Sequence, residues 1–399
     1  MKKSIGIIIT LLISLTHLTP AKAGYYANEF NSFLLALQQS NFSTDKLWDF
    51  ENPLVGKTQF VLPAKQAPWA GNYFAMQGGG IASRWQTNSH PSINERFPNR
   101  QQAMALTAAQ IDKLSPIEKY DLYVGDYSFQ ATKHELTHRG PYRPQRPEPW
   151  EGFCNGVRCA GFSLQEPKGP IDVTNNDGIP IRFHPTDLKA LAGASYFYVE
   201  KYTDIGRPSN GNEIAAAQPN PAIFDLALRF YIGVKKKSFV IDSHLGSEIW
   251  NESVVGFNRK IHDPAPLTKT EKVKFPGAVH KLLIETELYT LGEVDINETN
   301  GPTKKQVSNG EHLTTTPISY TLYINEDGKA FEGKWHKSKD EYGVDFAWFG
   351  SGGGADAKYA PDSPQESQRA NGNKDLDFSV IRRLFKIAQK QAPLCNMIF

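Results

Sequence analysis

One cysteine of this sequence lies where a thiol nucleophile would be effective. Cys154 follows Phe153 and precedes an apolar segment, Cys159 to Phe162, that favours a helix. The first turn of a helix offers unpaired N–H groups and the positive end of the helix dipole, and both lower the pKa of a thiol. Because the thiolate attacks carbonyl carbons, this position predicts covalent chemistry at Cys154. A buried structural cysteine is the competing interpretation.

A thiol nucleophile needs a base that accepts its proton and a group that orients the base. The segment from Ser238 to His244 resembles an apolar strand that ends with Asp242 and His244. Side chains two residues apart in a strand point to the same face. We therefore predict His244 as the base and Asp242 as its orienting acid. His280, at the start of another predicted strand, is the second candidate.

A second motif competes for the catalytic role. The segment from His134 to His138 reads H-E-x-x-H, in which two histidines on one helix face bind zinc and Glu135 acts as the base. Gly140 and Pro141 end any helix directly afterwards, and no third ligand follows at the usual spacing. We therefore expect no zinc here and interpret the segment as a polar lead into the following loop. A zinc peptidase stays as an alternative.

The N-terminus predicts export. Lys2 and Lys3 precede an apolar run from Ile5 to Leu18, and a small-x-small cleavage site ends at Ala23. These are the parts of a secretory signal peptide over residues 1–23. We expect a secreted or periplasmic protein. The apolar run is too short to span a bilayer comfortably and no later run is long enough, so we expect no integral membrane protein.

Composition excludes several other classes of protein. The net charge of +2 gives no argument for binding nucleic acid. Three cysteines, Cys154, Cys159 and Cys395, are too few for a disulfide-built secreted scaffold. Because the number is odd, at least one thiol stays unpaired within the chain, and a free thiol in an exported protein is a candidate nucleophile. The chain is also longer than one hydrophobic core usually serves.

Periodicity and turn residues predict a mixed α+β fold. A proline-rich loop from Gly140 to Pro149 leads to Cys154, and an amphipathic helix closes the chain. The segment from Asp172 to Gly178 clusters oxygen ligands but more closely resembles an ordinary turn. The predicted helices are Gln101 to Lys113, Ser115 to Tyr120, Cys154 to Leu164, Pro185 to Leu191 and Asp375 to Gln391; the predicted strands are Phe239 to Asp242, Ala278 to Leu291, Ser319 to Ile324 and Ala330 to Trp335.

Several motifs resemble one known family. The segment Ile249 to Phe257 is similar to the peptide V-W-N-Q-P-V-R-G-F of oomycete cell-wall transglutaminases, which plants detect as a defence elicitor, although Ser253 replaces its proline. The matching residues are Trp250, Asn251, Val254, Gly256 and Phe257. Further similar segments are Leu114 to Asp121, E-x-x-x-R-G at Glu135 to Gly140, W-x-G-x-C-N-G at Trp150 to Gly156, Asp187 to Leu191, and Val344 to Trp348. The chain therefore resembles the transglutaminase elicitors and their bacterial relatives.

The resemblance implies a transglutaminase with a papain-like core and Cys154 as its nucleophile. In that family the thiolate attacks a protein glutamine, and a lysine amine or water takes the acyl group. The backbone at Cys154 and the indole of Trp150 are candidate oxyanion donors. The family is thought to depend on calcium, and no ligands for it are identified here. Relatives are expected to carry a histidine where this chain has Asp225, which would make His244 the replacement base or the chain inactive.

These inferences give a domain plan and a set of alternatives. We predict an N-terminal extension or pro-region over 24–104, a catalytic domain over 105–349, a flexible linker over 350–374 and a C-terminal helix over 375–399. The expected partners are protein substrates that supply the glutamine and the amine. A cysteine peptidase or amidase on the same core is the first alternative. An inactive, elicitor-like protein that binds partners through the surface around Trp250 is the second.

Overall fold

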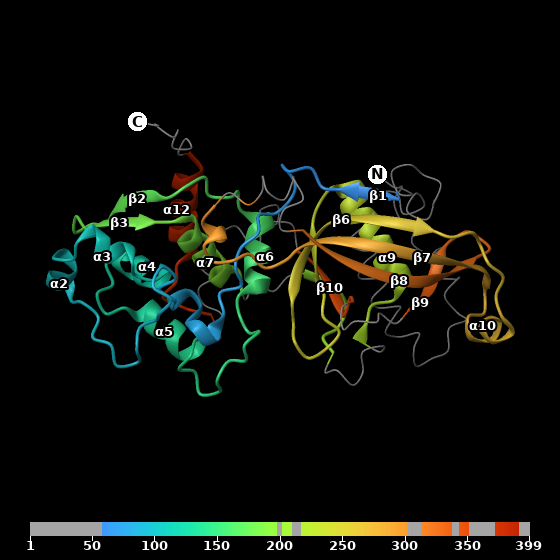
Figure 1. The fold of residues 1–399 in the computed structure, drawn as a ribbon, viewed down its shortest axis with the longest axis horizontal. Helices are drawn as coiled ribbons and strands as arrows, with labels where there is room; N and C mark the ends of the chain where they lie inside the picture. Colours follow the sequence, from blue (N-terminus) through green and yellow to red (C-terminus); the bar gives the residue numbers. More distant parts are fainter. Residues whose placement is uncertain are drawn as a thin grey trace, which may run out of the picture.

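The chain folds into two lobes that lie side by side along the long axis of the molecule (Figure 1). The computed structural model describes residues 58–197, 202–209, 217–301, 303, 313–336, 343–350 and 372–390. Each lobe encloses a large hydrophobic core of its own, one formed mainly by helices and the other by a sheet. The presence of two cores agrees with the expectation from chain length, because the chain is longer than one hydrophobic core usually serves. The predicted signal peptide lies outside the described residues.

The helical lobe surrounds α7 (Pro185–Tyr196), whose neighbours include α4, α6 and α12. Its other elements are η3 (Met76–Gly78), η4 (Gly80–Ala82), α2 (Arg100–Met104), α3 (Ala108–Asp112), α4 (Pro116–Val124), α5 (Gln130–His138), α6 (Cys154–Ser163), the hairpin of β2 (Ile171–Thr174) and β3 (Pro180–Phe183), η6 (Glu298–Asn300) and α12 (Phe378–Lys390). The predicted helices that begin at Ser115, Cys154 and Pro185 are therefore confirmed, and the last of them is longer than predicted.

Local capping explains one wrong prediction in this lobe. The segment from Gln101 to Lys113 forms two short helices, α2 and α3, rather than one. Thr107 accepts a hydrogen bond from the backbone of Gln110, whose side chain accepts one from the backbone of Thr107, so a capping box starts a new helix there. The H-E-x-x-H segment is also helical, as α5, and not merely a lead into the loop.

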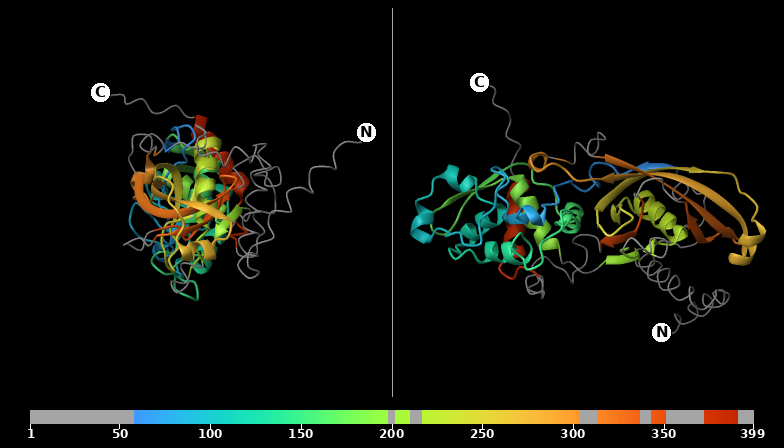
Figure 2. Two further views of the ribbon diagram at one scale, coloured as in Figure 1. Left: turned by 90° about the vertical axis from the view of Figure 1, so that its right-hand side faces the viewer. Right: turned by 60° about the horizontal axis from the view of Figure 1, so that its bottom comes forward.

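The β lobe is a curled antiparallel sheet that wraps around α9 (Pro221–Leu228) (Figure 2). Its strand order is β4-β10-β5-β6-β7-β8-β9, and β1 pairs with β6 beyond the end of β5. The elements are β1 (Gln59–Val61), β4 (Tyr202–Gly206), the π-helical turn η5 (Arg229–Lys235), β5 (Phe239–Asp242), β6 (Asn251–Ile261), α10 (Lys269–Lys274), β7 (Ala278–Leu291), β8 (Leu313–Asn325), β9 (Ala330–Trp335) and β10 (Phe346–Gly350). The four predicted strands are confirmed, although β8 begins earlier than predicted.

The described part of the predicted N-terminal extension is built into both lobes. Trp69 and Ile81 are buried in the helical lobe, and β1 pairs with β6 of the β lobe. A methyl group on Gly256 of β6 would lie 2.7 Å from the carbonyl oxygen of Phe60, so only glycine lets β1 approach. Residues 58–104 therefore pack against the rest of the fold, and whether they are a pro-region stays a prediction.

The predicted C-terminal helix is confirmed as α12. The residues of its apolar stripe, Phe378, Ile381, Leu384, Phe385 and Ala388, are all buried in the helical core. The helix contacts α7 and β2, so it completes the lobe rather than standing apart. Most of the predicted linker, residues 351–371, lies outside the described residues. Among the described helices, none is long and apolar enough to cross a membrane.

Candidate active site

Cys154 is the first residue of α6, the helix of the helical lobe that faces the β lobe (Figure 1). The thiol is buried, with 6% of the residue exposed. Phe153, the residue before α6, makes no side-chain cap, and in the first turn the Gly156 N–H donates to the side-chain oxygen of Asn155 at 2.7 Å. The predicted position of Cys154 at a helix N-terminus is therefore confirmed. Cys159, further along α6, is also a free and buried thiol.

The motif around Cys154 includes a glycine because α6 and α7 touch at that point. A methyl group on Gly156 would lie 2.0 Å from the carbonyl oxygen of Gly193 and 2.8 Å from the backbone nitrogen of Phe197. Real Cβ atoms do not approach other atoms so closely, so any side chain at Gly156 would push the two helices apart. The last glycine of the W-x-G-x-C-N-G pattern thus allows α6 to pack closely against α7, and the cysteine of the pattern is the predicted nucleophile.

The β lobe supplies the polar neighbours of the thiol. The side-chain amide of Asn251, the first residue of β6, donates a hydrogen bond to Cys154 Sγ at 3.3 Å. The Trp348 indole N–H donates to the Asn251 side-chain oxygen at 2.8 Å and so fixes the orientation of the amide. The Ile249 carbonyl oxygen lies 3.9 Å from Sγ and is the acceptor the thiol faces. Asn251 was predicted only as part of the elicitor-like motif.

Two charged residues complete this group. Arg158, one turn along α6 from Cys154, donates to the backbone oxygen of Asn251 at 3.0 Å and forms an ion pair with Glu293 at 2.7 Å. Glu293 follows β7, and its second carboxylate oxygen is buried with no hydrogen-bond partner among the described residues. The sequence analysis missed both residues. A glutamate directly after a long predicted strand was the available signal.

The pKa of the thiol reflects this environment. Burial raises the pKa of Cys154, and the nearby charge of Glu293 raises it further. Hydrogen bonds from Asn251 and the charge of Arg158 act in the opposite direction and do not outweigh burial. The helix N-terminus therefore does not by itself produce the low thiol pKa that its position predicted. A base, or an incoming substrate, must help to ionise Cys154.

His244 and Asp242 lie at the end of β5, as predicted, but their side chains do not form a pair. One carboxylate oxygen of Asp242 accepts the backbone N–H groups of Trp250, at 2.9 Å, and His244, at 3.2 Å. Asp242 thus holds the turn between β5 and β6. Burial raises its pKa to about 7, although these two hydrogen bonds act to lower it. Among the described residues, no histidine hydrogen-bonds Cys154.

Asp225 lies in the core of the β lobe and not beside Cys154. Its carboxylate forms ion pairs with Arg229 at 2.8 Å and Arg259 at 2.9 Å, and the Tyr320 hydroxyl donates to it at 2.7 Å. All four side chains are buried. The expectation that Asp225 occupies the position of a catalytic histidine is thus not supported by its location. It balances buried arginines instead.

The elicitor-like motif is mostly buried. Val254 and Phe257 lie in the core of the β lobe, and Asn251 contacts the thiol. Trp250 is half-buried, donates its indole N–H to Glu248, and packs against Tyr73 with ring centroids 5.7 Å apart. Most of the motif is therefore inaccessible to a partner, and binding through the surface around the half-buried Trp250 stays a prediction. Trp150 lies in the turn before α6 and is not among the hydrogen-bond partners of Cys154.

The acidic side chains of the two candidate metal-binding segments form ion pairs with arginines. The rings of His134 and His138 stack with centroids 4.2 Å apart, but the carboxylate of Glu135 pairs with Arg139 and accepts from Asn373, so it is not available as a base. The turn after Asp172 connects β2 to β3, as predicted. Its carboxylates pair with arginines, Asp172 with Arg182 and Asp177 with Arg100. Within the described residues, no cluster of three or more His, Cys, Asp or Glu forms a metal site.

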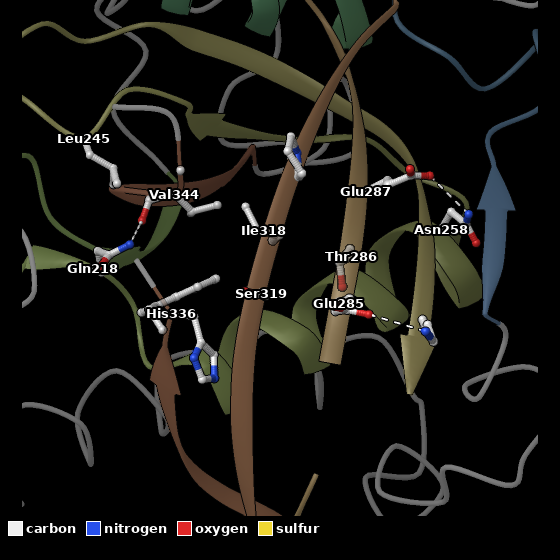
Figure 3. A pocket seen from close by; sticks show the side chains of 14 residues that line it. Gln218, Leu245, Asn258, Glu285, Thr286, Glu287, Ile318, Ser319, His336 and Val344 are labelled. Carbon is white, nitrogen blue, oxygen red and sulfur yellow. Dashed lines mark hydrogen bonds and ion pairs between the residues drawn. The ribbon is translucent and has the colours of Figure 1, made fainter. Parts of the chain in front are cut away.

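A separate pocket of about 570 Å³ opens in the β lobe (Figure 3). Its lining includes Leu245, Val344 and Trp335, and at one side of it the side chain of Gln218 donates to the Val344 carbonyl. None of the residues around Cys154 lines this pocket. It is therefore not the binding site for a substrate of the thiol.

A family model now connects this geometry with known proteins. The model of the transglutaminase elicitor family matches residues 146–358, more than half of the chain, including Cys154, Asn251, Glu293 and Trp348. The chain belongs to the transglutaminase elicitor family. The resemblance seen in the motifs is thereby confirmed. No protein of curated function matches the chain.

Among solved structures, the GP42 transglutaminase from Phytophthora sojae is similar in fold to this member of the elicitor family. The TM-score is 0.59 and the sequence identity 20%, over 83% of this chain and 91% of that chain. The shared architecture is a mixed helix and sheet fold with a curled antiparallel sheet. At this identity the match shows the fold alone. The predicted domain boundaries stay predictions.

Proposed function

We propose that this protein is a secreted protein-glutamine γ-glutamyltransferase that works through a thioester at Cys154. The observation that carries the proposal is the position of the thiol. Cys154 begins a helix in one lobe and accepts a hydrogen bond from Asn251 of the other lobe. A nucleophile held between a helix N-terminus and a facing sheet is also the basis for proposing a papain-like core.

The chemistry follows from this placement. Cys154 Sγ attacks the γ-carbonyl carbon of a protein glutamine, the C–S bond forms, and the C–N bond breaks with release of ammonia. The backbone N–H groups of Cys154 and Asn155, at the start of α6, are the proposed donors to the oxyanion, since the Gly156 N–H already bonds the Asn155 side chain. A lysine amine then attacks the thioester and the C–S bond breaks, which leaves an isopeptide bond. Water in place of the amine gives deamidation.

Calcium dependence is part of the proposal, but no step is routed through the ion. The described residues do not provide a fitting cage, because the carboxylates of the turn after Asp172 are paired with arginines. Calcium is therefore a condition to test rather than a group in the mechanism. The proposed export is tested separately, by the N-terminal sequence of the mature protein, which should begin near Gly24.

The decisive experiment is incorporation of a fluorescent primary amine into a glutamine-rich protein, with calcium and with chelator. We expect labelling by the wild type and none by Cys154→Ala. Cys159→Ala is the matched control, because Cys159 is a buried thiol on the same helix and should be dispensable. Equal labelling by Cys154→Ala would contradict the proposal. Substrate cleavage in place of labelling would favour the peptidase alternative.

An inactive relative is the second candidate, and one observation favours it. Cys154 is only 6% exposed, and its thiol pKa is raised by burial. In that case the folded wild type would show no labelling, no deamidation and no cleavage under any condition. The Ile249 carbonyl lies 3.9 Å from Sγ and the next residue, Trp250, packs against Tyr73, so this segment is one of the neighbours that bury the thiol.

A further inference from the structure

Glu293 reaches the active site because of strand pairing. β6 and β7 are antiparallel, and Ser253 lies opposite Leu291 at one end of the pair. Asn251 begins β6 and Glu293 follows β7, so both residues lie at this same end of the sheet, next to α6. Asn251 contacts the thiol there.

Arg158 links Glu293 to the nucleophile. Its guanidinium donates from Nε to the backbone oxygen of Asn251 at 3.0 Å, and from Nη2 to Glu293 Oε1 at 2.7 Å and the Gly292 carbonyl oxygen at 3.2 Å. Cys154 and Arg158 are four residues apart on α6 and therefore share a helix face. The carboxylate is thus held at the lobe interface through one of its two oxygens.

The other oxygen of Glu293 lacks a hydrogen-bond partner among the described residues. Oε2 is buried, although 26% of the whole side chain is exposed and the backbone N–H of Tyr73 lies close enough to lower the pKa of the carboxyl. A buried carboxylate oxygen without a donor is unfavourable unless a proton reaches it. Cys154 has a proton to give, and the charge of Glu293 already acts on its thiol. Sγ faces the Ile249 carbonyl in this structure, so the thiol must turn from that carbonyl toward Oε2 before the transfer.

We propose that Glu293 is the catalytic base of this enzyme, with Oε2 accepting the thiol proton of Cys154 in place of a histidine. This inference rests on the proposed function. As the C–S bond forms, the thiol proton moves to Glu293. The leaving nitrogen takes that proton as the C–N bond breaks, and ammonia departs. In the second half, the amine gives its proton to Glu293 while it attacks the thioester, and the departing sulfur recovers it.

The acidity of Glu293 suits such a role. Burial raises its pKa to about 7, and the charge of Glu252 on β6 raises it further, while Arg158 on α6 and the backbone of Tyr73 lower it. A group that titrates near neutral pH is an effective base and then an effective acid. The thiol of Cys154 and the phenol of Tyr73 also lie near Glu293. Burial raises the pKa of Tyr73, and the charges of Glu293 and Cys154 raise it further.

The test uses the full mature chain and compares Glu293→Gln, Glu293→Asp and Glu252→Gln. We expect Glu293→Gln to lower kcat for amine incorporation by about 10²–10⁴-fold with little change in KM. Glu293→Asp should retain most of the rate. Glu252→Gln removes a neighbouring carboxylate and should keep kcat while moving the acid limb of the pH profile to lower pH.

A second readout separates catalysis from structure. The rate of iodoacetamide alkylation at the Cys154 peptide, followed against pH by mass spectrometry, reports ionisation of the thiol. Because the charge of Glu293 raises the thiol pKa, Glu293→Gln should ionise Cys154 at lower pH and yet slow acyl transfer. A merely structural residue would not produce these opposite effects.

Two results would overturn the proposal. One is full kcat in Glu293→Gln together with loss of activity in His244→Ala. The other is an identical alkylation profile in the wild type and Glu293→Gln, which needs no acyl transfer and is therefore informative even if the wild type labels nothing. Absence of labelling by the wild type alone would end the proposed function, not this link between Glu293 and the thiol.

Discussion

Two carboxylates paired with arginines behave differently in this protein. Asp225, in the core of the β lobe, has two arginines and a tyrosine hydroxyl around it. Burial alone would raise its pKa, but Arg259 and Arg229 outweigh burial and lower it. Glu293, at the lobe interface, has one arginine and an oxygen without a donor, and its pKa rises to about 7. Full pairing fixes a charge in place, whereas incomplete pairing leaves it able to exchange a proton.

The contrast between Asp225 and Glu293 is tested most directly by measuring the free energy of unfolding of a variant at each position. Asp225→Asn leaves two buried arginines without their counter-charge and should lower the free energy of unfolding by about 3–5 kcal/mol. Glu293→Gln leaves Arg158 without its counter-charge but also removes a carboxylate whose charged form is disfavoured by burial, so the two effects oppose and the net loss at pH 8 should be smaller than in Asp225→Asn. Urea denaturation of both variants measures the difference. Similar losses in the two would show that the carboxylates are equivalent.

The helical lobe contains another carboxylate whose pKa is raised by burial, Asp121, and the pH dependence of stability tests its protonation. Burial raises the pKa of Asp121 to about 7, so between about pH 4 and pH 7 the folded state binds more protons there than the unfolded state. The contribution of Asp121 to stability therefore falls as pH rises through this window, by at most about 1.4 kcal/mol per pH unit. Asp121→Asn should remove that fall from the urea midpoint.

Asp126 is the matched control for this prediction. Its pKa is lowered by hydrogen bonds from Ser128 and Gln130, although partial burial acts to raise it. Its contribution is thus present above the unfolded pKa and is lost as pH falls. Asp126→Asn should reduce stability at pH 7 and change little at pH 3. The same pH response in both variants would mean that burial does not decide these shifts.

The smallest expected effect concerns the orientation of Asn251. Trp348→Phe keeps most of the ring but removes the N–H that donates to the Asn251 side-chain oxygen. Loss of that hydrogen bond should cost about 1 kcal/mol, which is roughly a fivefold decrease in kcat if the amide must face the thiol. Trp335→Phe is the control, since its indole bonds the Pro219 carbonyl in the β lobe. An unchanged rate in Trp348→Phe would show that Asn251 is held by the backbone alone.

Local signals in the sequence predicted much of the framework. The helix at Cys154, the strand from Ala278 to Leu291 and the apolar stripe of α12 all follow from periodicity and from helix-start residues, and the structure confirms them. One helix was wrongly predicted as continuous across Thr107, because a capping box inside a polar run has no effect on the apolar pattern. The family motifs correctly identified the membership of the chain.

By itself the sequence determined the family and the position of Cys154 at the start of a helix, because both depend on residues that are close together along the chain. Only the tertiary structure decided which side chains meet the thiol. Asn251, Glu293 and Trp348 lie 97 to 194 residues from Cys154, at the start of β6, just after β7 and in the middle of β10, and the curled sheet brings them together beside α6. Likewise, His244 and Asp225 were plausible partners by residue type, yet the fold directs one to a turn and buries the other among arginines. Residue types limit the chemistry that is possible. Which groups share a site is decided by the pairing of strands that are distant in sequence, and that pairing is stabilised by burial of the hydrophobic cores of the whole fold.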